Sequence, residues 1–130
     1  MKELVLTFGG ILGTLAVISG AFGAHALKKK LSENQLESFE TGVKYQMYHA
    51  IILIIIGIIF PFIELSQVIM AWCFLLGTLL FSFSIYGLVM STASGKKLSF
   101  LGPVTPIGGL LLVVGWVLLT YNLSRWALYL

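Results

Sequence analysis

Two histidines are the side chains of this sequence that are best suited to chemistry. His25 ends the first long apolar run and His49 lies one turn inside the second, so the two stand on neighbouring antiparallel helices. Tyr45 and Gln46, four and three residues before His49, share its helix face. Ionisable residues at membrane depth usually serve a function, and we therefore predict a polar ligand-binding patch of His25, Tyr45, Gln46 and His49. The alternative is that the imidazoles only hydrogen-bond one another, a backbone carbonyl or lipid headgroups.

Hydroxyl groups in the third and fourth apolar runs could extend this patch. In "LLFSFSIYGL", Ser82 and Tyr86 are four residues apart and share a face, whereas Ser84 lies on another. The fourth run begins "FLGPVTPIGG", where the prolines fix the helix start and Thr105 is a candidate cap. We predict Ser82, Tyr86 and Thr105 as further ligand-binding residues, on the same side as the histidines. The alternative is that they only link helices to one another.

The composition shows which elements must position these side chains. Of the 130 residues, 58% are hydrophobic and only 10% are charged, against about 25% charged in a soluble domain. The surface must therefore face lipid. Four segments approach the roughly 20 apolar residues of a membrane helix and contain no Asp, Glu, Lys or Arg: residues 4–27, 45–63, 68–90 and 104–123. We predict a single transmembrane domain over residues 1–130, an all-α four-helix bundle with both termini on the same side.

The lysines indicate how this bundle is oriented. Six of them fall in the first and third links or at the adjoining helix start: Lys28, Lys29, Lys30, Lys44, Lys96 and Lys97. The positive-inside rule places these in the cytoplasm and both termini outside. We predict that they bind anionic lipid headgroups. Aromatic belts are expected at the outer boundary (Trp72, Tyr121, Trp126 and Tyr129) and at the inner one (Tyr45 and Tyr48).

The first apolar run also resembles a signal peptide, because a lysine and an apolar core precede Ala24-His25-Ala26. Its length exceeds that of a signal core, and the lysines at 28–30 follow at once. We therefore expect it to be retained as a membrane helix.

Small residues predict where the helices pack. Gly9, Gly13, Gly20 and Gly23 recur at three- and four-residue spacing on one face of the first span, and such stripes allow close helix approach in lipid. Gly108 is expected to allow close helix approach in the fourth span. The glycine face either packs inside the protomer, which we favour, or forms a homodimer contact.

The second helix is expected to begin before the membrane. Ser32 and Gln35 form a capping box, and Leu36, Phe39 and Val43 then line one face. This pattern predicts an amphipathic cytoplasmic extension, with Gly42 as a candidate bend where the helix enters the bilayer.

Several function classes lack their sequence signals. There is no GxSxG, HExxH or Walker motif and no Asp at all, so an enzyme is the less favoured class. Cys73 is alone, two histidines are too few for structural zinc, and no broad basic face suits nucleic acid. We predict no metal or cofactor. The two histidines could still ligate a haem, which is the least favoured reading.

Four motifs together resemble a known family: "GAFGAHALKKKL", "YQMYHA", "LFSFSIYGL" and "GPVTPIGG". They are similar to the small integral membrane proteins of unknown function typified by the bacterial YgdD and YwdK proteins, with animal relatives. Phe83 departs from the small residue that this family usually has between the two serines. The resemblance implies a four-span protein of the bacterial cytoplasmic membrane without an assigned reaction. The matching motif positions are Gly20, Gly23, His25, Tyr45, Gln46, His49, Ser82, Ser84, Tyr86, Gly102, Pro103, Thr105, Pro106 and Gly108.

These observations favour a non-enzymatic membrane protein. It would bind a lipid, an apolar small molecule or a partner membrane protein at the cytoplasmic headgroup level, with anionic lipids as its main neighbours. The alternative is a transporter or channel for a small solute, which would require a homo-oligomer because four helices rarely enclose a wide path.

Overall fold

The computed structural model describes residues 1–128, and its regular elements in that range are all helices. Its elements, in chain order, are α1 (Lys2–Phe22), the π-helical turn η1 (Gly23–Leu27), α2 (Glu33–Ile59), α3 (Leu65–Thr78), the π-helical turn η2 (Leu79–Phe83), α4 (Ser84–Ala93), the short 3-10 helix η3 (Ser99–Leu101) and α5 (Val104–Ala127). They form four rods long and apolar enough to cross a membrane, which confirms the predicted all-α, four-span architecture. Tyr129 of the expected outer belt lies outside the described residues.

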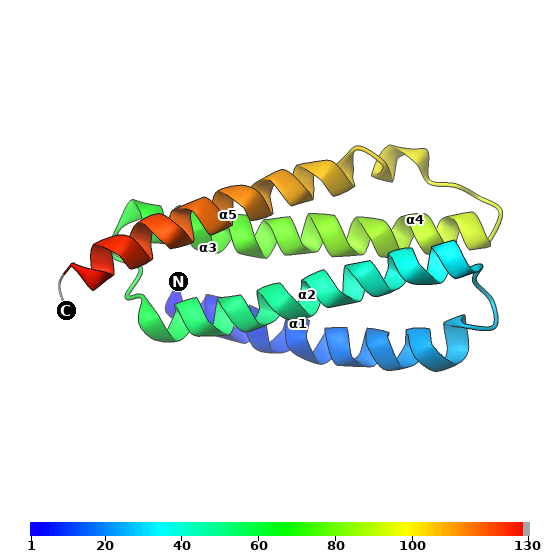
Figure 1. Cartoon of the computed structure of the whole chain (residues 1–130), viewed down its shortest axis with the longest axis horizontal. Coiled ribbons are helices and arrows are strands. Elements are labelled where there is room, and N and C mark those ends of the chain that lie inside the picture. Colours follow the sequence, from blue (N-terminus) through cyan, green and yellow to red (C-terminus); the bar gives the residue numbers. More distant parts are fainter. Residues whose placement is uncertain (129–130) are drawn as a thin grey trace.

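The rods pack in the order α1, α2, α3–α4 and α5 (Figure 1). α1 packs almost entirely on α2, and α5 packs on α3 and η2, so α1 and α5 form opposite edges. Burial follows this order: 22% and 17% of the apolar windows of the two edge rods are buried, against 39% and 50% for α2 and α3–α4. Both lysine-bearing links lie at one end, and the N-terminus, the α2–α3 turn and the end of α5 lie toward the other (Figure 1).

The start of α2 confirms the predicted capping box. Ser32 Oγ accepts the Gln35 backbone N–H at 3.3 Å, and Gln35 Oε1 accepts the Ser32 N–H at 3.0 Å. The helix then runs without interruption through Gly42 to Ile59. Its amphipathic first turns continue the membrane helix and bury Phe39 against Leu27 and Val89.

A strained turn joins α2 to α3. Phe62 has a φ of 57°, a region that non-glycine residues rarely adopt. Its side chain is only 8% exposed and belongs to the main apolar core. Burial of the ring offsets the backbone strain, and the turn therefore places Glu64 at a fixed position before α3.

Glycines set the distance between neighbouring helices. Gly9, Gly13, Gly20 and Gly23 all face α2 of the same chain. A Cβ on Gly9, for example, would lie 3.2 Å from the backbone oxygen of Ala50. The glycine stripe therefore packs inside the protomer.

Gly108 makes the closest backbone approach. A Cβ there would overlap the backbone nitrogen of Phe81 in η2 and lie 2.9 Å from the carbonyl carbon of Leu80. Gly109, its neighbour, has room, because a Cβ there would meet only the Phe81 ring at 3.7 Å. The start of α5 is thus held directly against the π-helical turn.

These two adjacent glycines provide a matched test of the seam. We expect Gly108→Ala to lower the free energy of unfolding by about 1–3 kcal/mol, the usual cost of overpacking. Gly109→Ala should be neutral or stabilising by up to about 1 kcal/mol, because alanine favours a helix. Thermal unfolding in detergent measures both, and equal effects of the two substitutions would contradict the seam.

Candidate functional site

His49 is a fixed, neutral bridge between α2 and α5. Its Nδ1 lies 2.7 Å from the Tyr45 carbonyl oxygen, which can only accept, so Nδ1 carries the proton. Its Nε2 therefore accepts the Trp116 indole N–H, at 3.2 Å. The imidazole is 3% exposed, and its two nitrogens are occupied by these two partners. His49 thus connects helices that share no close backbone contact.

Gln46 forms a second buried link, one turn away on α2. Its Nε2 donates to the Leu12 carbonyl of α1 at 2.8 Å, and its Oε1 accepts the Tyr86 hydroxyl of α4 at 2.8 Å. The Tyr86 ring packs on Phe39, with ring centroids 4.8 Å apart. One amide therefore joins three of the four rods. Its α1 partner is a backbone group, which residue types and spacing could not predict.

The predicted serines lie at the π-helical turn η2. Ser82 donates to the Gly42 carbonyl of α2 at 2.8 Å. Ser84 donates to the Phe81 carbonyl at 3.0 Å and lies 2.7 Å from the Thr105 hydroxyl. Since its single hydrogen is used on Phe81, the Thr105 hydroxyl is the donor of that pair. Thr105 thus ties α5 to the turn and is not the cap of α5, because the N-cap position is Pro103 and no side chain caps this helix. π-helical turns are frequent at functional sites.

The structure does not bring His25 into the expected patch. α2 pairs with α1 from its first turns, so that Gly23 faces Phe39 whereas Gly13 faces Ala50. His25 follows Gly23 and His49 precedes Ala50, which separates the two histidines by about 15 Å along the helices at 1.5 Å per residue. His25 is exposed in η1. The two imidazoles therefore cannot ligate one haem iron within a protomer, since both axial ligands must reach the same metal.

An amphipathic cavity of about 380 Å³ opens at the end that carries the lysine-bearing links. It lies between the first turns of α2, the end of α4 and the start of α5. Its lining is polar at Asn34, Gln35, Ser38, Thr92, Lys97 and Thr105 and apolar at Ile85, Leu88 and Val89. Sequence reasoning had singled out only Lys97 and Thr105 as binding residues. The remaining polar residues read as an ordinary solvated helix start, and only the meeting of three helices makes them a lining.

The six predicted headgroup lysines are all exposed: Lys28, Lys29, Lys30, Lys44, Lys96 and Lys97. Five of them lie at this end, whereas Lys44 lies eleven residues into α2. Lys97 alone lines the cavity, and the other four at this end form a basic rim around it.

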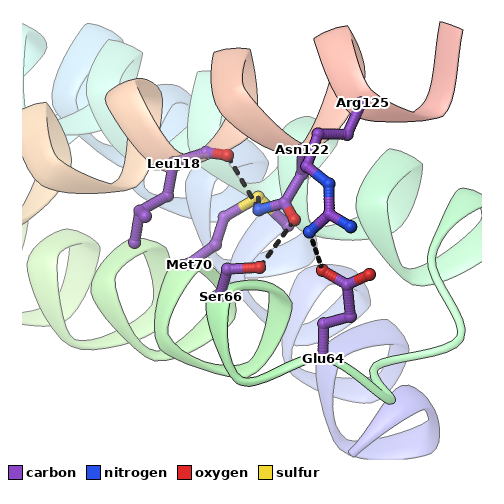
Figure 2. A network of polar contacts seen from close by, with 6 residues as sticks. All are labelled: Glu64, Ser66, Met70, Leu118, Asn122 and Arg125. Carbon is purple, nitrogen blue, oxygen red and sulfur yellow. Dashed lines mark hydrogen bonds and ion pairs between the residues drawn. The ribbon is translucent and has the colours of Figure 1, made fainter. Parts of the chain in front are cut away.

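A polar cluster that sequence reasoning missed links α3 to α5 at the opposite end (Figure 2). Asn122 is 3% exposed, accepts from Ser66 Oγ at 2.8 Å and donates to the Leu118 carbonyl at 2.8 Å. Beside it, Arg125 Nη1 donates to Glu64 Oε2 at 2.7 Å. The sequence did contain a signal for this cluster, an asparagine within an apolar run, because a buried amide requires hydrogen-bond partners.

Together these features define a small helical membrane protein with four apolar helices tied by buried polar links. The profile of the family described as "Protein of unknown function (DUF423)" matches residues 19–109. The chain belongs to this family, and residues 19–109 contain the four motifs quoted above.

Its relatives are also membrane proteins. The chain is 38% identical over 125 residues to the UPF0382 membrane protein SAB0533 of Staphylococcus aureus, covering 96% of this chain and 98% of the relative. It is 39% identical over 117 residues to the UPF0382 membrane protein SH2409 of Staphylococcus haemolyticus, covering 90% and 92%. A UPF0382 membrane protein of Staphylococcus epidermidis shares 35% over 127 residues, covering 98% and 99%. No solved structure matches the chain significantly.

The Gln46–Tyr86 link can be tested by a double-mutant cycle. Tyr86→Phe removes the hydroxyl that donates to Gln46 Oε1, and we expect the free energy of unfolding to fall by about 1 kcal/mol. Once Gln46→Leu has removed the acceptor, the same change should have little further effect. Chemical or thermal unfolding in detergent gives the coupling energy, and additive effects would mean that the two side chains do not interact.

The opposite end allows a contrast between buried and exposed links. Asn122→Leu should lower the free energy of unfolding by about 1–3 kcal/mol, because it leaves the Ser66 hydroxyl without its acceptor. Glu64→Gln should change it by only about 0–1 kcal/mol, since the Glu64 and Arg125 side chains are 44% and 40% exposed. The same unfolding measurement ranks the two, and the reverse order would show that the ion pair holds this end.

Proposed function

We propose that this protein binds the anionic headgroup of a membrane lipid or related amphiphile in the cavity between α2, α4 and α5. The observation that carries the proposal is the lining itself. Lys97 is its one charged residue, and the amides of Asn34 and Gln35 and the hydroxyl of Thr92 can donate hydrogen bonds. Such a set of donors with a single cation suits a phosphate group.

The position of the cavity on α2 supports the same ligand. Asn34 and Gln35 lie in the first turn of this 27-residue helix, whose N-terminus carries the positive end of the helix dipole. An anion in the cavity would therefore be stabilised by the helix as well as by Lys97.

The apolar wall favours an amphiphile over a free ion. Ile85, Leu88 and Val89 form this wall, and a hydrocarbon segment joined to the headgroup can pack against it. We assign the cavity to the cytoplasmic leaflet of the bacterial cell membrane, with both termini outside, because the positive-inside rule places the lysine-bearing end there.

Substitution of the cavity lysine, compared with a matched control, tests the proposal. In vesicles or nanodiscs with equal phosphatidylglycerol and phosphatidylcholine, Lys97→Gln should reduce the phosphatidylglycerol retained on the protein about fivefold, as loss of about 1 kcal/mol for one lysine implies. Native mass spectrometry after mild detergent extraction counts the retained lipid.

Lys29→Gln is the matched control. It makes the same charge change at the same end of the bundle but does not line the cavity. It should lower phosphatidylglycerol retention much less. If the two variants lose lipid equally, binding is a property of the basic rim as a whole and the cavity is not the site.

A further inference from the structure

A second cavity continues deeper along the same three helices. It has a volume of about 640 Å³ and is lined by Tyr45 and His49 of α2, by Phe81 of η2 and by α5 from Pro106 to Trp116. Phe81 is one helical turn from Ile85 of the headgroup cavity, and Pro106 follows Thr105. The two cavities share no lining residue, but they follow one another between α2 and α5. We call the two together the groove, and α3–α4 forms its floor.

Residue spacing shows that the groove follows one face of each helix. The α2 wall includes Asn34, Ser38, Tyr45 and His49, with Gln35 beside Asn34, and the floor includes Phe81, Ile85, Leu88 and Thr92, with Val89 beside Leu88. Intervals of three, four or seven residues keep positions on one face of an α-helix.

The chemistry of the groove changes with depth. At the lysine-bearing end it offers Lys97 and uncharged donors. Deeper, its lining is mostly apolar, and the ring of Tyr45 lies on Phe81 with centroids 4.7 Å apart. At the far end His49 and Trp116 hydrogen-bond each other across the groove, so these polar atoms already have partners.

Its length corresponds to one leaflet. Ser38 and His49 are eleven residues apart on α2, or about 16 Å at 1.5 Å per residue. Half of a hydrocarbon core of about 30 Å is about 15 Å. A groove of this length can therefore take a hydrocarbon chain about as long as one half of that core.

We infer that this groove holds one acyl chain of the anionic amphiphile whose headgroup occupies the Lys97 cavity, and that the His49–Trp116 pair marks the end of the chain. The inference rests on the proposed function, to which it adds the ligand class: an acidic headgroup on a hydrocarbon chain of about one leaflet's length. Charge complementarity at Lys97 and continuity with the headgroup cavity select this occupant over bulk lipid of any headgroup.

Gly109 provides a way to block the groove without disturbing the fold. It lines the deep cavity, and a Cβ there would meet only the Phe81 ring, at ordinary contact distance. Gly109→Leu should therefore fill the groove. Gly10→Leu is the matched control, because Gly10 lies exposed on α1 with nothing near its Cβ position. Val113→Phe, at another lining residue, is a second blocking variant should Gly109→Leu lower thermal stability.

Quenching of Trp116 by brominated lipids tests the inference. With Trp72→Phe and Trp126→Phe, Trp116 is the remaining indole of the chain. Phosphatidylglycerol brominated near its chain end should quench Trp116 more strongly than the matching phosphatidylcholine at equal mole fraction, by up to about fivefold for one lysine contact. Bromine near the headgroup should quench Trp116 weakly. Gly109→Leu should abolish the phosphatidylglycerol preference, and Gly10→Leu should leave it intact.

The outcomes separate this inference from the proposed function. If phosphatidylglycerol retention depends on Lys97 but both brominated lipids quench Trp116 equally, the headgroup site stands and the acyl-chain groove is wrong. If retention does not depend on Lys97, both fail. If brominated phosphatidylglycerol still quenches Trp116 more strongly than phosphatidylcholine in both Gly109→Leu and Val113→Phe, the acyl-chain groove is also wrong.

Discussion

Close approach of α2 to its neighbours is the constraint on which the rest of this structure depends. Helices in lipid gain little from hydrophobic association and must instead fit closely. Gly9 lets α1 reach the backbone of α2, and Gly42 leaves room for the Tyr86 ring of α4. At the other seam, Gly108 allows α5 to lie against the backbone of η2. These contacts bring the rods within the short reach of side-chain hydrogen bonds.

The buried polar links follow from that distance. Because α1 lies close to α2, the Gln46 amide reaches a backbone carbonyl of α1 and still accepts the Tyr86 hydroxyl. The Ser82 hydroxyl likewise crosses to the Gly42 carbonyl. In each case a side chain bonds where only hydrocarbon would otherwise surround it, and an unpaired polar group there is costly. The same residue types that suggested a binding site thus also hold the helices in register.

Much of the fold could be predicted from the sequence, whereas little of the site could. Hydropathy and charge located the four spans, and Ser32 with Gln35 fixed the start of α2. The relative depth of the two histidines was harder to predict. Lys44 suggested that the membrane begins near Tyr45 and so placed both histidines at its boundary, whereas pairing along the glycine stripe places His49 well away from His25. Partners on other helices, such as Trp116 for His49, depend on helix rotation, which single-helix periodicity does not determine.

The way His49 is held has a consequence for the polar centre of the bundle. A relay through a bilayer requires groups that can both take up a proton and pass it on. His49 donates its Nδ1 proton to the Tyr45 carbonyl, and its Nε2 accepts the Trp116 indole N–H, a group that cannot itself accept a proton. Tyr86 and Ser82 likewise point their hydrogens at fixed acceptors. In this structure the hydrogens of these three side chains are therefore held by partners within the protomer, and each of the side chains links two helices.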